Sequence, residues 1–63
     1  MSPAIEQIRE TTRRQLQLVE TNMQTINELM DVAKKAGLDT SNHKLRIKSM
    51  EKKRDTLIQA LGL

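Results

Sequence analysis

Six basic side chains and a single acid lie in the stretch KLRIKSMEKKR, residues 44–54. Clustered basic groups attract the phosphates of nucleic acids and the acidic surfaces of proteins, because their fields add. On a helical wheel Lys44, Lys48 and Lys52 share one outer face. These three lysines are therefore the candidate contact for nucleic acid or for an acidic partner. A solvated lysine-rich surface without a ligand is the competing interpretation.

Residue types that perform catalysis or hold metals are scarce. The chain has no cysteine and one histidine, which removes thiolate chemistry and most metal sites. His43 has only Asp39 one turn earlier as a partner, and no serine or cysteine nucleophile stands in a plausible triad with it. No glycine-rich loop or carboxylate pair occurs. The sequence predicts a protein that is not an enzyme, with no catalytic, cofactor-binding or metal-binding residues and no small-molecule substrate.

The amino-acid composition excludes further classes of function. The net charge of +3 comes entirely from residues 39–63, and phenylalanine, tyrosine and tryptophan are absent. Stacking platforms for single-stranded nucleic acid therefore cannot be built. Apolar runs are far shorter than the roughly 20 residues that cross a bilayer, and the N-terminus lacks the apolar core of a secretory signal. We expect a cytoplasmic protein without a membrane partner.

Glycine and proline punctuate the chain at few places and predict two helices in one domain, residues 1–63. Ser2 and Pro3 suit the N-cap and first position of a helix over 3–36. Gly37 suits a left-handed cap, with Leu38 folding back on the last turn, so the turn covers 37–40. The second helix covers 41–61, and Gly62 suits its end.

Apolar residues recur at threes and fours along both helices and predict that they pack together. The first stripe is Ile5, Ile8, Thr12, Leu16, Val19, Met23, Ile26, Met30 and Ala33, and the second is His43, Ile47, Met50, Arg54, Leu57, Ile58 and Leu61. The mean step of the first stripe favours coiled-coil packing. The predicted fold is all-α, an antiparallel helical hairpin with a long first and a shorter second helix.

The unequal helix lengths predict a homodimer. At 1.5 Å per residue the helices run about 51 Å and about 30 Å, so the second ends opposite Leu16 and leaves the N-terminal stripe uncovered. A second apolar flank, including Leu18, Leu29 and Val32, also needs a neighbour. We expect two hairpins to form a four-helix arrangement. The candidate interface residues are Ile5, Ile8, Thr12, Leu16, Leu18, Leu29 and Val32.

The long helix, the turn KKAGLDTSN and the shorter basic helix together resemble the short open-reading-frame products of the exo–xis region of lambdoid phages. The resemblance implies an early phage protein that influences the lysis–lysogeny choice or host physiology through a host or phage protein. The chain also looks like the plasmid copy-number proteins of the Rop type, which are dimeric helical hairpins that bind paired RNA loops. Their helices are nearly equal in length and their binding face carries a phenylalanine, so no functional residue is transferred.

Three functions remain after this reasoning. The leading hypothesis is a non-enzymatic, homodimeric helical regulator that acts by protein–protein interaction. The alternative is a dimer that binds DNA or structured RNA through Lys44, Lys48 and Lys52. A purely structural assembly subunit is the third.

Overall fold

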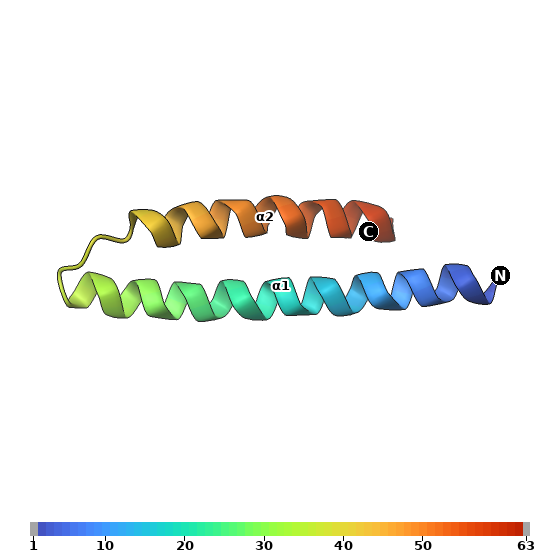
Figure 1. The fold of residues 1–63 in the computed structure, drawn as a ribbon, viewed down its shortest axis with the longest axis horizontal. Helices are drawn as coiled ribbons and strands as arrows, with labels where there is room; N and C mark the ends of the chain where they lie inside the picture. The colour runs from blue at the N-terminus through green and yellow to red at the C-terminus, as the bar shows by residue number, and fades with distance from the viewer. Residues whose placement is uncertain (1, 63) are drawn as a thin grey trace.

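The computed structural model describes residues 2–62 as two antiparallel helices, α1 (Pro3–Lys35) and α2 (Ser41–Leu61), joined by one short connection (Figure 1). Within these residues no strand occurs, and the two helices pack against each other along their length. The predicted all-helical class and the pairing of the helices are confirmed. The predicted domain limits, Met1 and Leu63, lie outside the described residues.

The first turn of α1 is closed by backbone groups rather than by a side chain. Ser2 has the extended conformation of an N-cap, and its carbonyl oxygen accepts the N–H groups of Ile5 and Glu6 at 3.1 and 3.3 Å. Its hydroxyl makes no capping hydrogen bond. Pro3 stands at the first helical position, where its missing N–H costs nothing. The expected places of Ser2 and Pro3 at the start of the helix are confirmed.

The end of α1 is a Schellman motif. Gly37 has φ of 75°, its N–H donates to the Lys34 carbonyl, and the Leu38 N–H donates to the Ala33 carbonyl at 2.9 Å. The left-handed glycine was expected. The helix ends at Lys35, one residue before the predicted limit. Leu38, which was expected to fold back on the last turn, stays 65% exposed.

The start of α2 is held by Asp39. One carboxylate oxygen of Asp39, Oδ1, accepts the Ser41 N–H at 3.0 Å and the Ser41 hydroxyl at 2.6 Å. Thr40, the N-cap by backbone geometry, makes no side-chain cap and is itself buried. These hydrogen bonds, that from the hydroxyl first, lower the pKa of Asp39 from its ordinary value of 3.8.

A heptad seam joins the two helices. The least exposed residues of α1 are Arg9, Thr12, Leu16, Val19, Met23, Ile26, Met30 and Ala33, which we call the inner seam. On α2 the least exposed positions keep three-and-four spacing except at the adjacent pair Leu57 and Ile58; they are His43, Ile47, Met50, Arg54, Leu57, Ile58 and Leu61. Such spacing places side chains on one face of a helix. Two i,i+4 ion pairs lie along the exposed side of α1, Glu10–Arg14 at 2.8 Å and Asp31–Lys35 at 3.8 Å.

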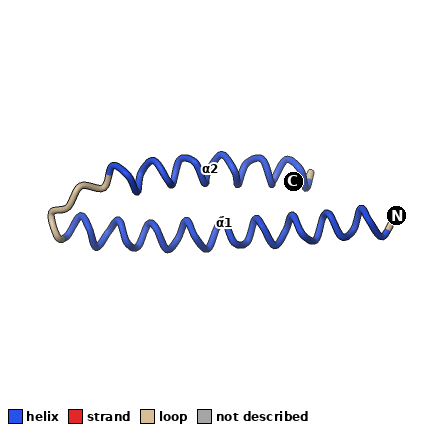
Figure 2. Tube along the Cα trace, viewed as in Figure 1, coloured by secondary structure: helices blue, strands red, loops and turns tan. Residues whose placement is uncertain are grey.

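The second helix covers more of α1 than the lengths alone predict. Arg9 Nη2 donates to the Leu61 carbonyl oxygen at 3.4 Å, about two turns beyond Leu16, where the cover was expected to end. The reason is visible in the trace: the connection runs back over α1, so α2 begins inside the end of α1 (Figure 2). At the other end, α1 still extends beyond α2 (Figure 1).

The molecule is a rod rather than a globule. Its Cα atoms span 53 × 14 × 14 Å, with a radius of gyration of 15.1 Å. A compact domain of this length has a radius of gyration of about 11 Å. Among residues 2–62 no side chain is completely buried, and only Val19, Ile26, Ala33 and Leu61 form the buried apolar core. A single seam is therefore all that this chain buries by itself.

Candidate interaction surfaces

The basic face of α2 is exposed but mixed in charge. Lys44, Lys48 and Lys52 are all exposed, and none forms an ion pair within residues 2–62. Residues seven apart on a helix lie on the same line, which places Glu51 in line with Lys44 and Asp55 in line with Lys48. The structure thus brings the three predicted lysines onto one side of α2 and interleaves them with acids.

A charge-free heptad seam, which we call the neutral seam, runs the length of α1. Its residues are Ala4, Ile8, Thr11, Gln15, Leu18, Asn22, Thr25, Leu29, Val32 and Ala36. From Ile8 to Val32 each directly precedes an inner-seam residue, so the neutral seam lies about 100° around the helix from it. Leu18, Leu29 and Val32 are 57%, 54% and 64% exposed. This is an uncharged helix face whose large apolar side chains stay mostly exposed in the hairpin.

Local hydrogen bonding makes the neutral seam less polar than its sequence. The Thr25 hydroxyl donates to the Thr21 carbonyl at 3.2 Å, in the i to i−4 pattern by which threonine satisfies its own hydroxyl within a helix. A shallow hollow lies beside Asn22, Thr25 and Leu29, and Arg46 and Met50 of α2 form its other wall. A side chain from a facing helix fits such a hollow.

The N-terminal end of α1 carries the expected overhang in shortened form. Ile5 and Ile8 are 50% and 66% exposed, and with Arg9 they line a notch against the last turn of α2, from Gln59 to Gly62. Ile8 was expected on the stripe that faces α2. It lies on the neutral seam instead, because Arg9 takes the next inner-seam position.

The remaining predicted interface residues do not lie together. Thr12 and Leu16 are half-buried in the inner seam, and the Thr12 hydroxyl donates to the Ile8 carbonyl at 2.7 Å. They contribute to the hairpin itself. The outward-facing set is Ile8, Leu18, Leu29 and Val32, to which the structure adds Ala4, Thr11, Gln15, Asn22 and Thr25. Counting back in sevens from Leu29 and Val32 would have found these added positions from the sequence.

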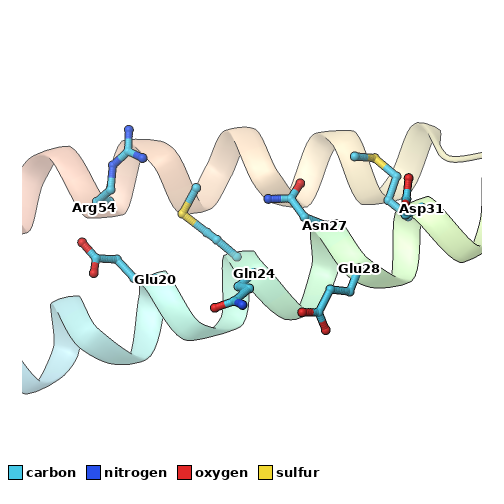
Figure 3. A pocket seen from close by; sticks show the side chains of 8 residues that line it. Glu20, Gln24, Asn27, Glu28, Asp31 and Arg54 are labelled. Atoms are coloured by element: carbon cyan, nitrogen blue, oxygen red, sulfur yellow. The ribbon is translucent and has the colours of Figure 1, made fainter.

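An open groove of about 690 Å³ is lined by Glu20, Glu28 and Asp31 of α1 and by Arg54 of α2, which stands opposite Glu20 (Figure 3). Arg54, a member of the second stripe, is half-buried, but its guanidinium points away from α1 and pairs with Asp55 at 3.3 Å.

His43 and the acidic side chains are the candidate metal ligands of the described chain, and its two helices are the candidate membrane spans. His43 packs on the inner side of α2 near the turn, and its Nδ1 atom is buried without a hydrogen-bond partner. Within residues 2–62 no three histidine or acidic side chains gather where they could hold a metal ion. Neither helix there combines the length and the hydropathy needed to cross a membrane.

Comparison with models of protein families, with curated protein sequences and with solved structures gives no match to this chain.

Proposed function

We propose that this chain is a non-enzymatic helical regulator that acts by protein–protein interaction and works as a homodimer of hairpins. The observation that carries the proposal is the neutral seam. A solvent-facing helix of a monomer normally carries charges around its outer side. Here ten consecutive heptad positions carry none, although the rest of α1 is rich in charge. A face of this composition is suited to a second helix.

The exposed surface supports association with a partner. The hairpin exposes 5143 Å². A compact monomer of its mass exposes about 4,100 Å². The excess of roughly 1,000 Å² is comparable to the about 800 Å² that each partner buries in a standard protein interface. A second copy covers this excess with the same kind of seam that already joins α1 to α2.

The test is to place charges on the neutral seam. Leu18→Glu with Leu29→Glu buries carboxylates in the proposed interface, and burial of an unpaired charge is strongly unfavourable. Sedimentation equilibrium should show the wild-type chain as a dimer and the double variant as a monomer. A wild-type chain that sediments as a monomer at high micromolar concentration contradicts the proposal.

Leu45→Glu is the matched control. Leu45 is 65% exposed, close to the exposure of Leu18 and Leu29, but it lies on the outer side of α2, away from the neutral seam. This variant should keep the mass of the dimer. If Leu45→Glu dissociates the chain as fully as the seam variant does, the interface lies elsewhere.

A second candidate function is supported by the exposed lysines of α2, which a dimer presents twice. Changing Lys44, Lys48 and Lys52 to Gln removes three charges per chain and leaves the inner seam untouched. If the dimer binds duplex DNA or structured RNA through this face, the triple variant loses affinity and its salt dependence flattens, because fewer counterions are released. Equal affinities of the two proteins for a duplex at low salt contradict this function.

We also propose a biological role for the dimer. The resemblance to phage early proteins suggests a regulator in the cytoplasm that engages a host or phage protein. Its support is the small size, the helical layout and the turn sequence. A partner recovered with the wild-type chain and lost with the monomeric seam variant would tie this role to the dimer.

A further inference from the structure

We infer that two copies of α1 pack antiparallel along the neutral seam, with Arg14 of each copy beside Glu28 of the other. The inference rests on the proposed self-association and adds the orientation and the register. It follows from the charges that border the seam and from the positions of its apolar residues.

The border of the neutral seam away from α2 carries a symmetric charge pattern. Its residues recur every seven positions as Gln7, Arg14, Thr21, Glu28 and Lys35. In antiparallel coiled coils these bordering positions face their own kind on the other helix. A register in which the two bordering Thr21 residues face each other brings Arg14 to Glu28 twice, since each lies seven residues from Thr21. Opposite charges at such positions set partner orientation.

Other arrangements lose this pairing. A shift by one heptad in one direction sets Arg14 against Lys35, and a further heptad sets Glu28 against Glu28 of the second copy. A shift in the opposite direction pairs Arg14 with Thr21 and leaves part of the seam uncovered. In a parallel dimer the two charged borders lie on opposite sides, and Arg14 faces the position of Val19 instead. Like charges in an interface are penalised.

The same register uses the whole seam. In this register the residue numbers of two seam positions that face each other add up to 40. Ile8 therefore meets Val32 of the second copy, and Ala4 meets Ala36. Near the two-fold axis, Leu18 lies against Asn22 of the second copy. The exposed Ile8 and Val32 at the two ends of the seam thus cover each other. The hollows at Asn22–Leu29, which Arg46 of α2 borders, and at Ala4–Thr11 receive side chains from the facing helix.

Disulfide formation between two different variants tests the orientation. The chain contains no cysteine, so single replacements report on one position each. Leu18→Cys and nitrogen-15-labelled Asn22→Cys chains are mixed in a glutathione buffer, and the linked species are weighed by mass spectrometry. The inferred register brings position 18 to position 22 of the other copy, close enough for a disulfide. The mixed disulfide should exceed the share that random pairing gives.

A parallel dimer gives the opposite result, because each cysteine then faces its own copy and the two homodisulfides dominate. That outcome overturns the inferred register while leaving the proposed dimer intact. A chain that sediments as a monomer overturns both.

Charge exchange provides an independent test that needs no cysteine. Arg14→Glu or Glu28→Arg alone replaces two attractive pairs per dimer with two repulsive ones and should weaken the dimer about tenfold. The double exchange Arg14→Glu with Glu28→Arg should restore the wild-type dissociation constant. Arg14 also pairs with Glu10 within its own chain, and the double exchange leaves that local pair broken. Failure of the double exchange to restore association therefore overturns the register.

Arg13→Glu is the matched control for the charge exchange. Arg13 is the neighbouring exposed arginine and lies on the side of α1 away from the neutral seam. It should change the dissociation constant far less than Arg14→Glu does. Equal weakening by both variants would mean a general charge effect and would also overturn the register.

Discussion

At the scale of single residues, Asp39 accepts the hydrogen bonds that hold the start of α2, although the sequence offers several neighbouring residues that could cap this helix. DTSN offers four residues able to cap a helix, and propensity does not choose among them. The choice is made by the Schellman motif, which fixes where the chain leaves α1. Asp39 then faces the first free N–H groups of α2 and accepts from Ser41.

Asp39 should give the hairpin a pH dependence in the acid range. Its pKa is lowered on folding, so its stabilisation is complete above its ordinary value of 3.8 and is lost as pH falls through the lower, folded value. Asp39→Ala should lower the thermal midpoint at neutral pH, and the difference from wild type should narrow in strong acid. Asp39→Asn retains an acceptor oxygen and should give the milder loss at neutral pH. A difference between Asp39→Ala and wild type that does not change with pH would contradict this role.

At the scale of the elements, the sequence predicts a helix limit well where a residue restricts the backbone angles. Pro3 and Gly37 set the limits of α1 because each imposes a backbone angle. The reach of α2 was not predictable from helix lengths. It depends on the path of residues 36–40, and these five residues can either project beyond a helix end or fold back along it. Ile8 was assigned to the wrong stripe because the apolar pattern passes over Arg9, a charged residue that is half-buried at the inner-seam position and donates to the Leu61 carbonyl oxygen.

Gly37 provides a test at this scale. A Cβ at Gly37 would meet no atom within 4 Å, so a substitution there is penalised by backbone strain alone. Gly37→Val should destabilise the hairpin by about 1 kcal/mol or more, because φ of 75° is unfavourable for a branched side chain. Gly37→Asn should cost less, since asparagine tolerates the left-handed region. The thermal midpoints of the two variants measure this order, and equal midpoints would mean that the turn rearranges.

At the scale of the whole molecule, stability and association are linked. The hairpin buries one seam and no complete side chain within residues 2–62, so cover from a second copy adds substantially to its free energy of unfolding. The thermal midpoint of the wild-type chain should rise by a few degrees for each tenfold increase in protein concentration. The monomeric variant with Leu18→Glu and Leu29→Glu should melt at one temperature at all concentrations. A wild-type midpoint independent of concentration would mean that the hairpin is stable alone.

The antiparallel path of the chain also orders the events of folding. The hydrogen bond from Leu38 to Ala33 closes a loop of few residues, whereas that from Arg9 to Leu61 joins residues 52 positions apart. Loop closure costs more entropy as the loop lengthens, so contacts near the turn form first and those at the open end form last. Replacement of Gly37 should therefore slow refolding. Loss of the Arg9 contact should mainly speed unfolding, because that contact is absent from the transition state.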